Sequence, residues 1–399
     1  MKKNSDVLIV GGSLSGCLLA LKLASSRSDV EVHLVEEGSR LAGSRTWTFF
    51  ESDVSRDSLR WLEPVLGKTW PEYHVQFPKL PHRKLTDPVY TLRSEDLHRH
   101  LTSLLGPKIK LRCQLASISD LDLTLKNGRK LNAPLVIDAR EASSLEENPM
   151  AGYPYSGYKK SLGFEFDFEN SHGLESPIMV DARCPQLDGY RYFTLLPWSD
   201  TRLSIYETFY SHSPNLHRER VSKSIFSYAE RRGWKLKPNL AISEIREESM
   251  ITPIPMTSQY ISVSVSGEAL PIGTKGGYFH AMTGDEFPDS IRFVEFIGDQ
   301  TDLSTQKVRD ALMKYRRSWI SRQRFYRSLN RLMFQNLEPS LRFQIFQSLF
   351  ENSSDAIERF HSGKTSWGDR LRILTGSSPT SFSQTLKSLS EKSIGEIKP

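Results

Sequence analysis

The sequence has little cysteine and no long apolar run. Its three cysteines, Cys17, Cys113 and Cys184, are scattered and form no Cys-x-x-Cys pair. We therefore expect neither a disulfide framework nor a metal site, and a reducing cytoplasm fits best. No stretch reaches the about 18 apolar residues that a membrane-spanning helix needs. The run VLIV after Asp6 leads straight into glycines and is too short for a signal-peptide core, so we expect any membrane contact to be a surface contact.

Strong charge of either sign is also missing. The formal net charge is +6 over 399 residues. This charge permits an anionic partner, such as a phosphate-bearing cofactor or an acidic lipid, without requiring one. Charge alone therefore predicts no nucleic-acid partner. A chain of this length predicts about two or three domains, each with enough apolar residues to bury a core.

Residues 1–40 have the pattern of a βαβ unit, with the strand DVLIV, the turn GGSLSG, the helix CLLALKLASS and the strand VEVHLVEE. Gly11, Gly12 and Gly16 lie between strand and helix, and Glu36 ends the second strand. This spacing predicts a dinucleotide site, where helix amides bind pyrophosphate and the acid bonds a ribose hydroxyl. Ser13 stands where the strict motif has glycine, and an ordinary tight turn is the alternative. Because Glu36 is acidic, FAD or NAD is favoured.

The rest of the chain changes character several times. RSEDLHRHLTSLL predicts a helix, and KIKLRCQL, LDLTLKNGRK and APLVIDAR predict strands. Residues 161–248 alternate aromatic and polar side chains, which predicts a separate antiparallel sheet interrupted by the helix SKSIFSYAERRG. Glycine-rich turns return after Glu268, as if the chain re-enters the first domain. Residues 303–376 then have a helical pattern and precede a Ser-rich tail.

Ten collinear segments together resemble the flavin-type bacterial lycopene β-cyclases. They read DVLIVGGSLSG, AGSRTWTFF, YTLRSEDL, VIDAR, HGLESPIMVDA, GYRYFTLLPWSDTRLSIYETFY, IREES, YFHAMTG, FYRSLNRLMF and RFHSGKTSWGDRLRILTG. The resemblance implies an α/β fold, α+β overall, in which a Rossmann-like FAD-binding domain carries an inserted antiparallel β-sheet substrate domain and a C-terminal helical segment. The implied limits are 1–75, 93–150 and 265–302 for the FAD-binding domain, 76–92 and 151–264 for the substrate domain, 303–376 for the helical region and 377–399 for the tail.

The resemblance also implies a reaction. It is an acid-catalysed isomerisation without net redox change, which folds the linear ψ-ends of lycopene or another acyclic carotenoid into β-ionone rings and gives γ-carotene and β-carotene. Members of the family need reduced FAD, with NAD(P)H as the reductant. Rival interpretations are a flavin monooxygenase or a polyprenyl reductase of the same fold, and a non-catalytic flavoprotein that binds carotenoid.

The stretch RLSIYETFYS alternates like a half-buried strand, and Glu207 falls on its apolar face. Cyclisation needs an acid that stays neutral near neutral pH, and an apolar setting raises the pKa of a glutamic acid. We therefore expect Glu207 to be the proton donor or a relay to flavin, and an ion pair with Arg191 or Arg202 is the structural alternative. The family carries two adjacent acids here, whereas this chain has Tyr206 before Glu207.

Further site residues follow from the resemblance. Asp181 and Glu248 are acids that either relay protons or hold structure by hydrogen bonds. A ring cation needs electron-rich faces and a cavity without water, and aromatic residues of the matching segments are either cavity or plain core. They are Trp47, Phe49, Tyr190, Tyr192, Trp198, Tyr206 and Tyr210. Beside the glycine turn, the expected cofactor contacts are Arg93, Gly277, His280, Thr283 and Gly284, although His280 could equally be a satisfied loop histidine.

A basic aromatic helix is predicted from Lys307 to Arg331, where nine Lys or Arg residues accompany a single acid, Asp310. One interpretation is a solvated helix face, and the other is a surface that rests on anionic lipid. Because lycopene is insoluble and has to come from a bilayer, we favour the second. The expected location is cytoplasmic, with peripheral attachment to the inner face of the cell membrane.

Overall fold

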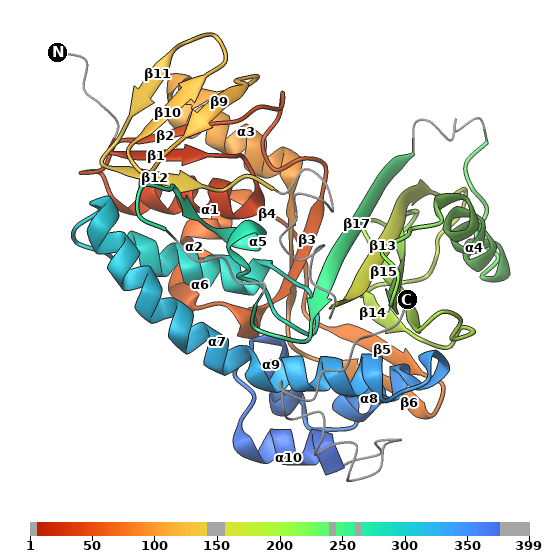
Figure 1. Ribbon diagram of the computed structural model, residues 1–399. Helices are drawn as coiled ribbons and strands as arrows, with labels where there is room; N and C mark the ends of the chain where they lie inside the picture. Colours follow the sequence, from red (N-terminus) through yellow and green to blue (C-terminus); the bar gives the residue numbers. More distant parts are fainter. Residues whose placement is uncertain (1–5, 142–155, 239–244, 260–264, 376–399) are drawn as a thin grey trace.

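The computed structural model describes residues 6–141, 156–238, 245–259 and 265–375, and Figure 1 shows how its elements are arranged. The predicted βαβ unit is present, with α1 (Leu14–Ser26) between two parallel strands. These strands belong to a five-stranded parallel sheet with the order β18 (Leu270–Pro271), β12 (Leu135–Asp138), β1 (Val7–Val10), β2 (Val32–Val35) and β8 (Ile109–Lys110). All residues of β1 and β12 are buried, because helices or loops cover both faces of a parallel sheet.

A seven-stranded sheet forms the second lobe, which Figure 1 shows beside the first. Its order is β17 (Arg246–Pro255), β13 (Ser156–Asp167), β16 (Arg202–Ser211), β15 (Tyr190–Pro197), β14 (Ile178–Asp181), β5 (Tyr73–Phe77) and β6 (Leu80–Leu85). All its pairs are antiparallel except β14 with β5. The alternation of residues 161–248 thus predicted the sheet correctly, and the fold class is confirmed. The domain limits stay a prediction.

Two small antiparallel sheets and several helices complete the described part of the chain. The sheets are β11 (Lys130–Asn132), β10 (Asp122–Leu125) and β9 (Leu115–Ile118), and β3 (Thr46–Phe50), β7 (Val89–Arg93) and β4 (Leu66–Trp70). The helices beyond α1 are α2 (Arg56–Leu62), α3 (Ser94–Leu105), α4 (Arg218–Arg231), α5 (Gly273–Gly276), α6 (Phe287–Gly298), α7 (Thr305–Gln335), α8 (Phe343–Phe350), α9 (Ser354–His361) and α10 (Trp367–Thr375).

Both faces of the seven-stranded sheet are covered, and this decides where the site lies. One face packs on α4 through an apolar cluster that includes Phe164, Ile205 and Ile225. The other face meets the C-terminal helices, where Tyr190 and Phe346 belong to a second cluster. Alternate residues of each strand therefore enter two different cores.

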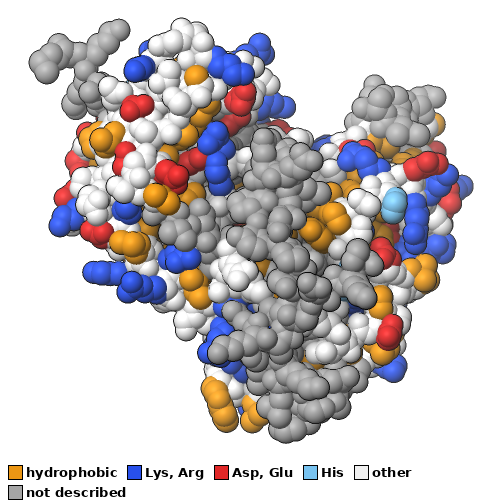
Figure 2. Space-filling model, viewed as in Figure 1, with side chains coloured by type: hydrophobic (Ala, Val, Ile, Leu, Met, Phe, Trp, Pro, Cys, Tyr) orange, Lys and Arg blue, Asp and Glu red, His pale blue; other side chains and the backbone are white. Residues whose placement is uncertain are grey.

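The basic helix predicted near the C-terminus is α7, but its cations do not share one environment. Arg309, Arg327 and Arg331 are buried, whereas four basic residues on its outer side are exposed: Lys307, Lys314, Arg317 and Arg324. Figure 2 shows Lys and Arg side chains along this edge of the molecule. Among the described residues, no helix combines the length and the apolar character needed to cross a bilayer.

Candidate active site

The turn between β1 and α1 packs closely against the backbone of its own chain. Gly11 has a φ of +106°, and a Cβ there would lie 2.4 Å from the Arg140 backbone nitrogen. A Cβ on Gly16 would lie 2.3 Å from the Gly11 carbonyl oxygen, so both positions require glycine. Ser13 caps α1, since its Oγ accepts a hydrogen bond from the Gly16 amide. The positive end of the α1 dipole thus begins at this turn, as pyrophosphate binding requires.

Glu36 lies against the same turn. Its Oε2 accepts from the Gly12 amide at 2.6 Å, and its Oε1 accepts from the Gly38 amide at 2.6 Å. The carboxylate is held at the end of β2, where a dinucleotide fold places the ribose. Turn, helix end and carboxylate together fit the adenosine side of FAD, and the cofactor contacts assigned to these residues stay a prediction.

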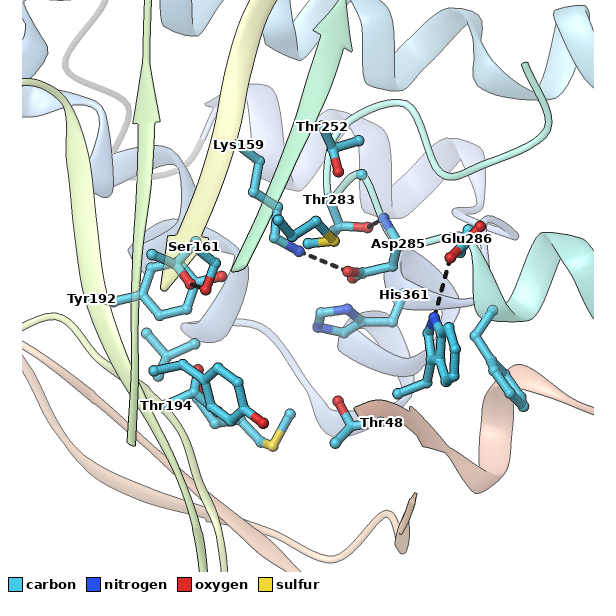
Figure 3. Close-up of a pocket in the computed structure, with 18 of the residues that line it drawn as sticks. Thr48, Lys159, Ser161, Tyr192, Thr194, Thr252, Thr283, Asp285, Glu286 and His361 are labelled. Atoms are coloured by element: carbon cyan, nitrogen blue, oxygen red, sulfur yellow. Dashed lines mark hydrogen bonds and ion pairs between the residues drawn. The ribbon is translucent and has the colours of Figure 1, made fainter. Parts of the chain in front are cut away.

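A cavity of about 250 Å³ lies between the seven-stranded sheet, β3, the loop 283–286, the start of α6 and the C-terminal helices. Figure 3 shows side chains from all of these elements pointing into it. Because they come from distant parts of the sequence, only the complete fold creates the cavity.

One wall of the cavity is aromatic. Tyr190 on β15 stacks on Phe346 of α8 with ring centroids 4.5 Å apart, and on Tyr192 at 4.9 Å. Tyr206 and Tyr210 of β16 complete this wall. Burial raises the pKa of all four tyrosines, so they stay neutral phenols. Electron-rich neutral rings are suited to a cationic guest.

The predicted aromatic residues divide into two groups. Trp47 lines the cavity with the four tyrosines, but Phe49 and Trp198 do not. Phe49 stacks on Phe287 at 4.3 Å in the core of the first lobe. Trp198 donates its Nε1 hydrogen to Ser204 Oγ at 2.7 Å and carries the Arg93 guanidinium 3.8 Å from its ring. Phe49 and Trp198 thus lie outside the lining of this cavity, and their role as substrate residues stays a prediction.

The opposite end of the cavity is polar. Lys159 Nζ on β13 lies 2.7 Å from Asp285 Oδ1 in the loop before α6, and Figure 3 shows the pair pointing into the cavity. The Asp285 side chain is 49% exposed. Its partial loss of hydration acts to raise its pKa, but the neighbouring Lys159 ammonium outweighs this and holds that pKa below its usual value. Both groups are thus charged, and the pair is electrically neutral overall.

Two other acids that line the cavity have pKa values raised to about 7. Burial raises the pKa of Glu286 to about 7, against the opposing charge of Arg45. Trp47 Nε1 donates to Glu286 Oε1 at 3.1 Å, which leaves Oε2 to carry a proton. Burial also raises the pKa of Asp53 to about 7. The Phe50 amide donates to Asp53 Oδ2 at 2.9 Å, and Oδ1 has no hydrogen-bond partner.

Glu207 does not line this cavity. Alternation on β16 turns Tyr206, Thr208 and Tyr210 toward the cavity and Glu207 toward α4. There the carboxylate is completely buried and pairs with Arg191. Burial raises the pKa of Glu207 while Arg191 lowers it. The structure thus shows the ion pair with Arg191 that was the structural alternative, and places Glu207 outside the cavity lining. The role of Glu207 as proton donor or relay to flavin stays a prediction.

The two predicted relay acids also lie in different places. Asp181 accepts hydrogen bonds from Tyr228 Oη at 2.8 Å and from Arg232 Nη2 at 2.9 Å, away from the cavity. Glu248 lies in the cavity wall, where its Oε2 accepts from the Thr46 amide at 2.9 Å and its Oε1 from Arg246 Nε at 2.8 Å. Glu248 alone of these two acids is thus beside the space that a substrate could enter.

The second predicted cofactor loop borders the cavity at Thr283 and Gly284. His280 holds its shape, because Nδ1 accepts from the Met282 and Thr283 amides and Nε2 donates to the Phe360 carbonyl at 3.1 Å. His280 is therefore the satisfied loop histidine. Gly277 ends α5 in the left-handed region with a φ of +79°.

Arg93, the remaining predicted cofactor contact, is engaged elsewhere. Its Nη2 lies 2.6 Å from Glu165 Oε2 on β13, and its guanidinium covers Trp198. The structure therefore places Arg93 between β7 and the seven-stranded sheet, and its role as a cofactor contact stays a prediction.

Five cavity residues with polar side chains were not predicted from the sequence: Asp53, Lys159, Asp285, Glu286 and His361. One signal was available for Lys159. Its strand pairs with β16 so that Lys159 lies opposite Tyr210 and Ser161 opposite Thr208, and residues opposite each other share a face. The others lie in turns or at helix ends, where periodicity gives no orientation.

Comparison with known proteins gives a consistent result. The family model described as "Lycopene cyclase protein" matches residues 6–387. A lycopene beta-cyclase of Pantoea ananas is 29% identical over 98% of this chain and 99% of its own, and one of Pseudescherichia vulneris is 31% identical over 94% of each. Two of the solved structures that share the fold illustrate the likeness.

The first is a probable FAD-dependent monooxygenase of Pseudomonas aeruginosa, with a TM-score of 0.57 and 17% identity over 86% of this chain and 99% of that one. The second is a geranylgeranyl bacteriochlorophyll reductase-like protein of Thermoplasma acidophilum, with a TM-score of 0.55 and 13% identity over 98% of this chain and 100% of that one.

Proposed function

The chain belongs to the lycopene cyclase family, and on that premise we propose that it acts as a lycopene β-cyclase. It would convert the ψ-ends of lycopene into β-ionone rings and give γ-carotene and then β-carotene. The observation that carries this proposal is the cavity, which combines a wall of neutral tyrosines with acids whose pKa is raised to about 7. Such a site suits proton-initiated chemistry on an apolar chain.

The cofactor is proposed to be FAD in its reduced form, with NAD(P)H as the reductant. Gly11, Gly16 and Ser13 would hold its pyrophosphate at the start of α1, and Glu36 its ribose. When bound, reduced FAD would supply an electron-rich ring system next to a cationic reaction. The residues of the chain itself then have to deliver the proton, fold the substrate and exclude water.

We assign the proton donor to Glu286. A glutamic acid of ordinary pKa is almost wholly ionised at neutral pH, whereas one with a pKa of about 7 is about half protonated. Trp47 fixes one carboxyl oxygen of Glu286 and leaves the other for the substrate. Glu248 accepts three hydrogen bonds, two from Thr46 and one from Arg246. We therefore propose that Glu248 positions the part of the cavity wall that contains Thr46.

The tyrosine wall would stabilise the positive charge that forms after protonation. Tyr206 stands at the strand position where the family carries its first acid. Because burial raises its pKa, Tyr206 is a poor proton donor to an alkene, but its ring face attracts a cation. This arrangement separates the group that starts the reaction from the groups that hold its intermediate.

The proposed location is the cytoplasmic face of the cell membrane, with peripheral attachment. The four exposed cations of α7 would meet anionic lipid, worth about 1 kcal/mol each near such a surface. On α10, Trp367 and Leu371 are 78% and 48% exposed and lie four positions apart on one helix face. Exposed apolar side chains beside cations are typical of an interfacial helix.

Expression in a bacterial strain that accumulates lycopene tests the proposal. We expect cyclic carotenoids from the wild-type chain and at least a tenfold smaller yield from Glu286→Gln, because glutamine has no proton to give. Glu295→Gln is the matched control, since Glu295 is a half-buried acid of α6 that accepts a hydrogen bond from Ser58 and does not line the cavity. Unchanged lycopene with the folded, FAD-loaded wild-type protein would contradict the function, whereas NADPH-linked oxygen uptake or hydrogenated pigment would support a monooxygenase or a reductase.

A further inference from the structure

His361, at the last position of α9, turns its ring into the cavity (Figure 3). We propose that His361 is the base that removes the proton from the cyclised cation, and that it thereby determines which ring isomer is released. The inference rests on the proposed cyclase function. It adds to that function the residue that ends the reaction.

The surroundings of His361 hold its ring and leave one ring nitrogen, Nε2, without a hydrogen-bond partner among the described residues. The ring packs beside Phe50 and Phe350, with centroids 5.0 and 6.0 Å away. Among the described residues, none provides a hydrogen-bond partner for Nε2. A buried imidazole nitrogen left without a partner is costly, and such unsatisfied groups are concentrated at functional sites.

The charge state of His361 is right for a base. Burial lowers its pKa to about 4, although the Asp285 carboxylate acts in the opposite direction. The imidazole is therefore neutral near pH 7 and able to accept a proton. A carbocation is a far stronger acid than imidazolium, so even this weakened base removes its proton downhill.

The other polar groups in the cavity wall are less suited to this step. Lys159 is an ammonium and has no free electron pair, and it holds the Asp285 carboxylate in an ion pair that lowers the pKa of Asp285 and so its strength as a base. Glu248 is occupied by Arg246 and Thr46. The tyrosines remain protonated because burial raises their pKa. His361 is the neutral nitrogen base among the described cavity residues.

The step balances in atoms and electrons. Glu286 gives its proton to C2 of the ψ-end, and the C1–C2 π electrons form the new C–H bond and leave a cation at C1. The C5–C6 π electrons then form the C1–C6 bond and leave a cation at C5. His361 takes the C6 proton, the C–H electrons restore the C5–C6 double bond, and the product is a β-ring. Nothing is oxidised or reduced.

The Asp285 carboxylate stabilises the positive charge that His361 acquires in these reaction steps. After the step His361 is an imidazolium and Glu286 a carboxylate, and the Asp285 carboxylate raises the proton affinity of His361. It neighbours Glu286 in the chain and also acts on it electrostatically. A proton moved from His361 to Glu286 within this group restores the starting state.

Removing the base changes the product, because a cation at C5 has three sets of adjacent protons. Loss from C6 gives the β-ring, loss from C4 the ε-ring and loss from the methyl group the γ-ring. His361→Phe keeps the aromatic packing but has no base. We expect purified FAD-loaded His361→Phe to form β-rings at least tenfold more slowly. The cation should then give a larger share of ε- or γ-rings, or return to lycopene, which would carry deuterium when the reaction is run in D₂O. His82→Phe, at an exposed position on β6, is the control.

The assay uses lycopene in vesicles with reduced FAD, and analyses ring type and deuterium content by chromatography and mass spectrometry. Restored β-ring formation when imidazole is added to His361→Ala would support the base directly, and this variant serves if the phenylalanine variant does not fold. Wild-type rate with only β-rings in His361→Phe would overturn the inference and leave the cyclase function intact. A wild-type protein that forms no rings would instead overturn the function, and the inference with it.

Discussion

Replacing Arg191 tests whether Glu207 is structural. The Glu207 carboxylate is completely buried, Arg191 is its ion-pair partner, and its second oxygen has no hydrogen bond. Taking one partner from a buried pair costs about 3–5 kcal/mol, because the remaining charge must stay unpaired or take up a proton. We therefore expect Arg191→Met to lower the free energy of unfolding by about this amount.

The double variant Arg191→Met/Glu207→Leu should recover most of that loss, since apolar replacements of both partners leave no charge behind. Glu207→Gln should keep normal β-carotene yield per folded molecule, because the side chain faces α4. Urea unfolding followed by tryptophan fluorescence measures the stability, and pigment analysis the activity. Loss of cyclisation in Glu207→Gln, with wild-type stability and FAD content, would refute our reading and return the proton path to Glu207.

Three further predictions concern other parts of the molecule. Burial raises the pKa of Asp53 to about 7, so its contribution to stability is complete below pH about 4 and is lost as the pH rises through 7. In Asp53→Asn, the free energy of unfolding measured from pH 4 to 8 should no longer show this loss, which is of the order of 4 kcal/mol. If its dependence on pH is the same as in the wild type, the raised pKa of Asp53 is contradicted. Gly16→Ala should reduce bound flavin per chain, because its Cβ would meet the Gly11 carbonyl, whereas Gly128→Ala in an open turn should not. Trp367→Ser with Leu371→Ser should weaken flotation with anionic vesicles, and equal weakening by Leu104→Ser, exposed on α3, would argue against α10 as the contact.

The glycine turn and the alternating strands could be predicted from sequence because each follows a local rule. Gly11 and Gly16 are required by the backbone itself, whatever binds there. The period of two on β16 correctly separates Tyr206 from Glu207. Local patterns of this kind survive folding because they depend on neighbours in the chain.

What alternation could not tell is which face of the sheet meets the cavity. It identifies an apolar face only when the other face is solvated. Here α4 covers one face and the C-terminal helices the other, so both sets of residues are buried. Glu207 lies on the more apolar face, which packs against α4, and there it pairs with Arg191. The acid Glu286 was hidden for a related reason, since its raised pKa depends on burial by segments far away in sequence, such as Trp47.

Tyr206 shows how the departure from the family pattern fits the rest of the site. Gly163 on β13 lies opposite Tyr206, and a Cβ on Gly163 would come 2.0 Å from the tyrosine ring. The ring therefore lies over a gap in the neighbouring strand, with one face toward the cavity. An acid at this position would bring a second negative charge close to Glu248, which already acts electrostatically on Tyr206. A neutral ring avoids that repulsion and contributes a surface for the cation, provided that the proton comes from elsewhere in the cavity. Glu286, on the loop before α6, meets that condition.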